Sequence, residues 1–160
     1  MISKDKSDDP GYVKSGYLYN LTKFIHYPQN AFNFSMSPFI IGVYGDDSIK
    51  SALVNTLRNK QINGREWKIE FYKNPQEIRH CHLIFIIGLS ADEAKSLVAF
   101  LINKKILTLA DNISGFCEMG GMVNLVGNFP NYGYQISLSA LSYAKLSVNP
   151  ELLDLATIID

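Results

Sequence analysis

The stretch His82–Ser90, with the sequence HLIFIIGLS, decides the fold of this chain. Leu83 to Ile87 is an unbroken run of branched and aromatic apolar residues, without the polar–apolar alternation of a strand that has one face in water. Such a run, ended by Gly88, predicts a strand that is buried on both faces.

A helix start follows this strand directly. Ser90 and Glu93 have the spacing of a capping box, in which each side chain accepts a hydrogen bond from the backbone amide of the other residue. A doubly buried strand followed by a capped helix is half of a βαβ unit. The sequence therefore predicts a three-layer α/β fold with a mainly parallel sheet flanked by helices.

Apolar runs and turn signals predict the other elements. Residues 1–10 are expected to form a flexible leader, and residues 11–160 a single domain. Apolar residues recur at helical spacing over 12–27 and predict a helix there. Strands are expected at 39–44, 67–72, 83–87 and 106–110, a C-terminal antiparallel hairpin at 122–126 and 133–137, and late helices at 139–145 and 150–159.

Composition limits the classes of protein to which the chain can belong. Its 160 residues suffice for one domain with a substantial core, and its 47% apolar content is typical of a globular protein. The formal net charge is zero and no block of Lys and Arg is dense, so nucleic acid is not an expected partner. The start, MISKDKSDDP, has no apolar segment, so either the protein is cytoplasmic or its signal peptide lies outside this sequence.

Two acidic residues follow the first predicted strand, where a phospho-receiver domain would hold magnesium. Asp46 and Asp47 could match that pair, but the phospho-accepting position falls at about Gly88, so this class is excluded. The segment starting at Gly45 has no GxGxxG pattern, and acids at a helix start would repel a pyrophosphate. Helix capping is the preferred interpretation of both aspartates.

Histidines and cysteines offer other candidates for chemistry. His80 and His82 lie on one face of an extended chain, but a metal pair there would need a third ligand, so histidines bonded to backbone are preferred. Cys117 is followed by Glu118, which disfavours a thiolate, and Gly-x-Ser-x-Gly is absent from the sequence. No catalytic residue, metal or cofactor is expected, and the chain is interpreted as a binding module.

A ligand site is expected at the carboxyl ends of the parallel strands, where α/β folds bind their ligands. The candidate ligand-binding residues are Gly45, Asp46, Asp47, Lys73, Asn74, Gly88, Ser90 and Asp111.

Several segments, in this order, are similar to a known family. They are GYLYNLTKFIHYP at Gly16–Pro28, FIIGVYG at Phe39–Gly45, CHLIFI at Cys81–Ile86, LTLAD at Leu107–Asp111, GGM at Gly120–Met122 and LLDLA at Leu152–Ala156. From about Tyr12 to its end, the chain resembles the YfiR-like family of bacterial periplasmic regulators. Tyr27-Pro28 stands where the family usually has Trp-Pro, and Tyr134–Leu138 lacks the Arg, Glu and Asn of a typical RFEIN-like segment.

The resemblance implies a non-catalytic periplasmic sensor. Such a module controls a membrane-anchored diguanylate cyclase or sensor kinase, is often a homodimer, and takes a small-molecule ligand in some cases. A signal peptide would then lie outside this sequence. The alternative is a cytoplasmic α/β nucleotide-binding protein or enzyme, which would need a phosphate cradle or an acid–base pair that the sequence does not show.

Two further expectations carry open alternatives. The aromatic side chains of Tyr12, Tyr17, Tyr19 and Phe24 provide either a partner or dimer contact or ordinary core packing. Cys81 and Cys117 are expected near the same end of the sheet, and the oxidising compartment implied by the resemblance would favour a disulfide between them. The alternative is two buried, unpaired thiols.

Overall fold

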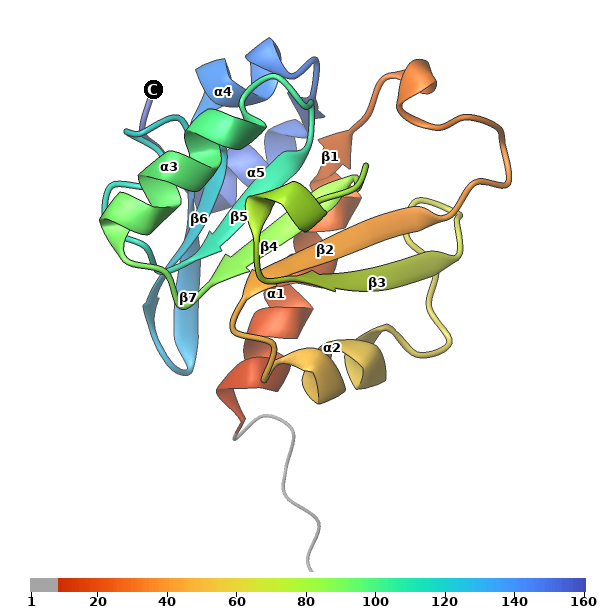
Figure 1. Cartoon of the computed structure of the whole chain (residues 1–160), viewed down its shortest axis with the longest axis horizontal. Coiled ribbons are helices and arrows are strands. Elements are labelled where there is room, and N and C mark those ends of the chain that lie inside the picture. Colours follow the sequence, from red (N-terminus) through yellow and green to blue (C-terminus); the bar gives the residue numbers. More distant parts are fainter. Residues whose placement is uncertain (1–8) are drawn as a thin grey trace, which may run out of the picture.

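The computed structural model describes residues 9–160, which form a sheet with helices on both faces (Figure 1). The strands of the sheet are β2 (Phe39–Gly45), β3 (Trp67–Tyr72), β4 (Leu83–Ile87), β5 (Leu107–Asp111), β6 (Val123–Asn128), β7 (Asn131–Ile136) and β9 (Ala156–Ile158). The helices are α1 (Pro10–Phe24), α2 (Lys50–Leu57), α3 (Ala91–Leu101), α4 (Leu138–Tyr143) and α5 (Pro150–Leu155), with short 3-10 turns η2 (Gln29–Ala31) and η3 (Pro75–Glu77).

The sheet has the order β3-β2-β4-β5-β6-β7-β9. Strands β3, β2, β4, β5 and β6 are parallel, β7 is antiparallel to β6, and β9 is parallel to β7. The predicted mainly parallel sheet with a C-terminal antiparallel hairpin is therefore confirmed.

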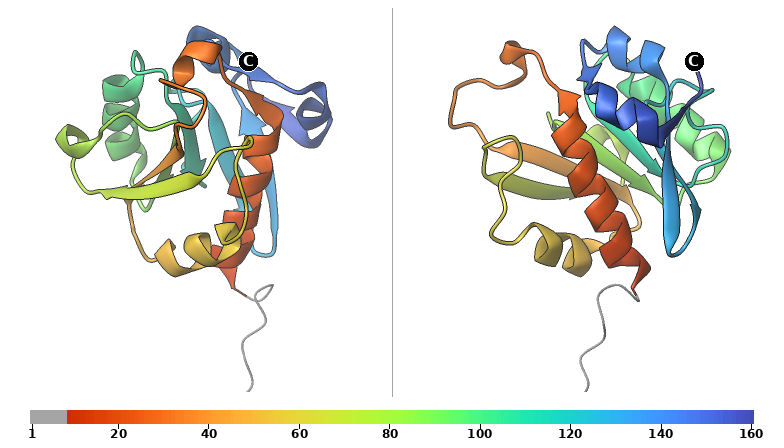
Figure 2. Two further views of the ribbon diagram at one scale, coloured as in Figure 1. Left: turned by 90° about the vertical axis from the view of Figure 1, so that its right-hand side faces the viewer. Right: turned by 180° about the vertical axis from the view of Figure 1, so that it is seen from behind.

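Strand β4 lies in the interior of the sheet and is buried on both faces, as predicted. Leu83 and Phe85 belong to the larger core cluster, whereas Ile84 and Ile86 belong to the second cluster on the opposite face. Helix α3 covers the second cluster, and α1, α2 and α5 lie on the other side (Figures 1 and 2). Water reaches neither face, so a polar residue at either set of positions would lose its hydration.

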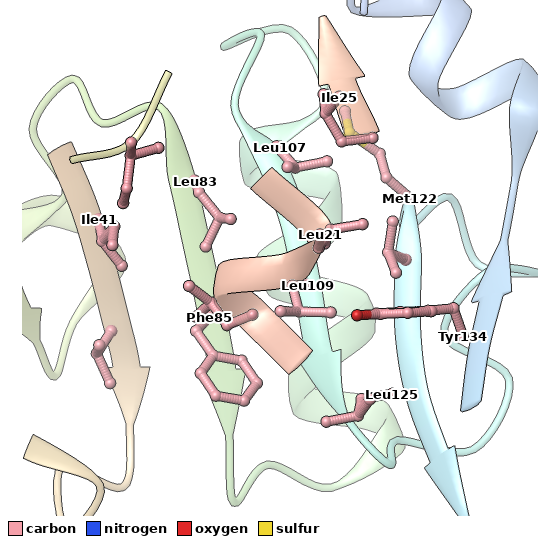
Figure 3. Packing of buried hydrophobic residues seen from close by; sticks show 14 of the residues in the cluster. Leu21, Ile25, Ile41, Leu83, Phe85, Leu107, Leu109, Met122, Leu125 and Tyr134 are labelled. Atoms are coloured by element: carbon pink, nitrogen blue, oxygen red, sulfur yellow. The ribbon is translucent and has the colours of Figure 1, made fainter. Parts of the chain in front are cut away.

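Helix α1 runs across the sheet and supplies much of the larger core. Leu18 and Leu21 are almost completely buried, and Figure 3 shows Leu21 near Leu107 and Leu109 of β5, which belong to the same core cluster. Helix α3 begins with the predicted capping box: the Glu93 amide donates to Ser90 Oγ at 3.2 Å, and the Ser90 amide donates to Glu93 Oε1 at 3.1 Å.

The predicted end of the first helix, at residue 27, was wrong. Helix α1 ends at Phe24, and Ile25–His26 forms the short strand β1, which pairs with β8 (Ser147–Val148). Pro28 disfavours a helical conformation at Tyr27, and pairing with β8 satisfies the backbone before it. Residues 1–8 of the predicted leader, 1–10, lie outside the described residues. Of its last two residues, Pro10 is the first residue of α1, and Asp9 is the N-cap, whose Oδ1 accepts from the Gly11 amide at 2.8 Å.

The last predicted helix, 150–159, was also too long. Helix α5 ends at Leu155, and Ala156–Ile158 pairs with Tyr134–Ile136 as β9. β-Branched Thr157 and Ile158 suit a strand, and β9 satisfies the backbone groups of β7 that would otherwise face water. Periodicity alone could not reveal this pairing because it depends on β7, which is distant in the sequence.

Candidate functional site

The predicted strand-end residues partly come together. Lys73 Nζ donates to the Gly45 carbonyl at 2.7 Å and lies 3.7 Å from Asp47 Oδ2. The Asp46 amide donates to the Ile87 carbonyl at 3.0 Å, and a Cβ built on Gly88 would lie 3.3 Å from Asp46 Cβ. The ends of β2 and β4 are thus adjacent, as the parallel sheet requires.

The backbones of these two strand ends are in close contact. Gly45 has a φ of +101°, and a Cβ built on it would lie 2.1 Å from the carbonyl oxygen of Ile87. Asp46 Oδ1 accepts from the Ser48 amide at 2.9 Å, and this hydrogen bond lowers the pKa of the Asp46 carboxyl. The prediction that the aspartates cap the helix itself was wrong in detail, because α2 starts at Lys50 without a side-chain cap.

The remaining predicted residues have separate structural roles. Asn74 forms a capping box with Glu77 at the start of η3, and Ser90 caps α3. Asp111 Oδ2 lies 2.8 Å from Lys14 Nζ of α1, whereas its buried Oδ1 has no hydrogen-bond partner among the described residues. A ligand role for the strand-end residues stays a prediction.

A cavity that the sequence analysis missed lies between α3 and α4, with a volume of about 330 Å³. We call it the α3–α4 cavity. Its apolar lining comes from α3, the segment that follows it, the residue before β6, and α4. These side chains are Val98, Leu101, Ile102, Met122, Ala140 and Tyr143.

Polar groups also line the α3–α4 cavity, and most serve the local structure. Thr108 Oγ1 accepts from the Met122 amide at 3.0 Å, and Ser137 Oγ accepts from the Ala140 amide at 3.1 Å to cap α4. The Asp160 carboxylate accepts from the Ser139 hydroxyl. Hydrogen bonds from the two serines lower the pKa of Asp160, so its carboxylate is charged at neutral pH.

Cys117 completes the cavity wall as a neutral thiol. Its Sγ donates to the Gln135 carbonyl at 3.5 Å. Burial, together with the negative charge of Glu118, raises the pKa of the thiol to about 12. A nucleophilic cysteine needs a lowered pKa, so the cavity is suited to binding rather than to thiol catalysis.

One hydrogen bond links α4 to the segment that follows α3, beside the cavity. The Tyr143 hydroxyl of α4 donates to Asn103 Oδ1, just beyond α3, at 2.7 Å. Phe100, Ile102 and Leu138, which lie in or next to α3 and α4, are exposed apolar side chains. The sequence analysis continued the last helix through 159. It therefore could not place Asp160 beside Ser139.

The predicted partner residues on α1 have contacts within the molecule. The Tyr134 hydroxyl donates to the Tyr17 carbonyl at 2.7 Å, and the Asn55 side chain donates to the Tyr12 hydroxyl at 2.8 Å. Tyr19 lies under Lys23, whose Nζ is 4.6 Å from the ring centroid. Phe24 is partly buried against the core. Core packing explains much of this aromatic surface, and a dimer or partner contact stays a prediction.

His82 is bonded to backbone, as preferred from the sequence. Its Nδ1 accepts from the Ile40 amide and its Nε2 donates to the Ala31 carbonyl, each at 3.0 Å. The ring stacks on Phe32 at a centroid distance of 4.2 Å. Burial lowers the pKa of His82 to about 4. Within residues 9–160 no group of three or more His, Cys, Asp or Glu side chains is arranged to hold a metal ion.

The candidate disulfide is not formed, because Cys81 and Cys117 are both free and buried. Cys81 packs between Gly42 of β2 and the second core cluster. Cys117 lies farther along the sheet, where its Sγ contacts the carbonyls of Met122, just before β6, and Gln135 of β7. β4 and β5 lie between these positions, so the loop that carries Cys117 does not bend back far enough to reach Cys81.

Comparison with known families agrees with the resemblance seen in the sequence. The model of the YfiR/HmsC-like family matches residues 12–157. The chain belongs to the YfiR/HmsC-like family. This family is known for periplasmic regulators of diguanylate cyclases, which supports a regulatory role. No helix in the part of the YfiR/HmsC-like chain that the structure describes is long and apolar enough to cross a membrane.

A solved structure shares the fold. It is a crystal structure of an ABC domain from Streptococcus pneumonia in complex with L-Trp, with a TM-score of 0.60 and 12% sequence identity. The match covers 94% of the YfiR/HmsC-like chain but only 60% of the chain in the solved structure. At this identity the similarity concerns the fold alone. A comparison with curated proteins gives no significant match.

Proposed function

We propose that this YfiR/HmsC-like chain is a non-catalytic periplasmic module that binds and controls a membrane-anchored signalling enzyme, either a diguanylate cyclase or a sensor kinase. The family match over residues 12–157 carries the proposal, because it spans almost the whole described domain. The α3–α4 cavity supports binding rather than thiol chemistry, because the Cys117 thiol in its wall has a raised pKa.

The α3–α4 cavity is the proposed place for a regulatory ligand. Small-molecule sites are usually preformed, largely apolar cavities with a few convergent polar groups. The cavity has this character, and α4, which forms one of its walls, is a short helix of six residues. A ligand between α3 and α4 would favour one spacing of these helices and so change the surface that a partner meets.

Co-purification from the native envelope fraction tests the partner. The tagged chain should retain a membrane protein with a diguanylate cyclase or kinase domain, whereas a tagged exported protein of another family should not. Deleting the gene should change the cellular level of cyclic di-GMP if the partner is a cyclase. A retained kinase with unchanged cyclic di-GMP would select the second partner class. Retention of neither enzyme, with unchanged cyclic di-GMP, would refute the proposal.

A further inference from the structure

The α3–α4 cavity combines an apolar interior with a negatively charged mouth. Its volume of about 330 Å³ lies at the low end of the range of small-molecule pockets, about 300–1,000 Å³. Val98, Leu101 and Met122 are buried and form apolar walls. These dimensions suit a small ligand with an apolar body, not a nucleotide or a peptide.

Charge at the cavity is of one sign. Glu118 and Asp160 line it, and among the described residues its lining contains no Lys, Arg or His. The ion pairs found within residues 9–160 involve other carboxylates, such as Asp111 with Lys14. Lys104, which follows α3, places its ammonium group 4.5 Å from the centroid of the Phe100 ring. Two carboxylates without a cationic partner attract a positively charged ligand and repel an anion.

A buried hydroxyl adds a polar contact inside the cavity. Thr108 is 4% exposed and lines the cavity. Its Oγ1 accepts from the Met122 amide, and among the described residues no acceptor is found for its own hydrogen. A threonine hydroxyl can donate one hydrogen bond while it accepts another. This hydrogen is therefore available to an oxygen or an aromatic face of a ligand.

We propose that the α3–α4 cavity binds a small amphipathic amine, with its apolar or aromatic body between α3 and α4 and its ammonium group beside Glu118 and Asp160. The inference rests on the proposed function, because a regulator that senses a ligand needs such a site. Its test nevertheless uses only the purified chain and is separate from co-purification of the partner.

Two probes of similar size and opposite charge test which sign of charge the cavity prefers in its ligand. Phenethylamine and 3-phenylpropionate share a phenyl ring and a short linker, and at neutral pH they carry an ammonium and a carboxylate group. Titration followed by NMR of the chain should show saturable binding of the amine at millimolar concentrations, with shifts at Val98 and Thr108. The carboxylate should bind at least several-fold more weakly.

Charge variants test the two acidic residues. The double variant Glu118→Gln with Asp160→Asn should weaken amine binding about 5-fold, since two exposed ion pairs are screened by solvent and contribute only modestly. The matched control is Glu151→Gln with Asp154→Asn, which removes two charges from exposed positions of α5 outside the cavity. The control should bind the amine like the unmodified chain.

A cavity-filling variant tests the location. Ala140→Leu adds three carbons to the α4 wall and should abolish amine binding, whereas Ala140→Ser should retain it; thermal unfolding verifies that both are folded. If Ala140→Leu does not fold, Ile102→Trp at the exposed rim replaces it. Equal binding of the two probes, unchanged binding in the filled variant or absence of saturable amine binding would each overturn the inference. If the partner still co-purifies, such a result refutes the amine site and leaves the proposed function standing.

Discussion

At the scale of single residues, Gly45 lies where the ends of β2 and β4 are in close contact. With φ at +101° and only 2.1 Å between a built Cβ and the Ile87 oxygen, this position has room for no side chain. Gly64 has a similar backbone, φ +75°, but nothing lies within 4 Å of a built Cβ. Comparing alanine substitutions at the two glycines therefore distinguishes the cost of steric overlap from the cost of backbone strain.

Gly45→Ala should destabilise the protein by more than Gly64→Ala. Strain at a positive φ costs about 1 kcal/mol for alanine, and this term applies to both variants. Only Gly45→Ala adds a backbone overlap, so we expect a further loss of about 2 kcal/mol or more in the free energy of unfolding. Urea unfolding of both variants measures the difference. Equal losses would mean that β2 and β4 are not in close contact at Gly45.

His82 gives the stability a pH dependence whose sign follows from its pKa of about 4. In the unfolded chain a histidine has a pKa of about 6.5, so between these values the unfolded state binds more protons than the folded state. Stability is then fully present above about pH 6.5 and falls as the pH approaches 4. Protonation would also turn Nδ1, which accepts from the Ile40 amide, into a donor.

Between pH 7 and pH 5 we expect the free energy of unfolding to fall by about 2 kcal/mol. In His82→Gln this change should largely disappear. His80→Gln is the matched control: His80 is exposed and lies edge-on to His82 at a centroid distance of 4.9 Å, so most of the change should remain. The measurement is urea unfolding at both pH values. A pH dependence that follows His80 and not His82 would contradict the proposed tautomer and its hydrogen bonds.

At the scale of elements, α3 depends on its capping box. Ser90→Ala removes the acceptor for the Glu93 amide and should cost about 1 kcal/mol of stability. Ser90→Asp should retain most of it, because a carboxylate also caps and interacts favourably with the helix dipole. Ser96→Ala, at an exposed position inside α3, is the control and should be neutral or slightly stabilising. Equal effects at the two serines, measured by thermal unfolding, would show that the cap contributes nothing.

At the scale of the whole molecule, the sequence predicted the parts that depend on local pattern. The unbroken apolar run from Leu83 to Ile87 predicted the parallel sheet, and the capping signal at Ser90 predicted the start of α3. It did not predict β9 or the β1–β8 pair, because these short strands exist only through partners that the fold brings to them. The α3–α4 cavity was missed for the same reason: β9 delivers Asp160 to its mouth.

The position of β4 leads to the last prediction, which concerns amide exchange. Leu83 to Ile87 lies between β2 and β5 and is buried on both faces, so its amides should exchange only when the whole domain unfolds. The edge strand β3 has one partner and includes partly exposed residues, and its amides should exchange faster by local opening. Native-state exchange in increasing urea measures both. The exchange of β4 should follow the global free energy of unfolding, and a destabilising variant such as Leu21→Ala, which should cost about 2–5 kcal/mol, should accelerate it by the corresponding factor. If β4 exchanged as fast as β3, the proposed interior position of Leu83 to Ile87 would be wrong, and with it the arrangement that brings Thr108 of the neighbouring β5 to the cavity.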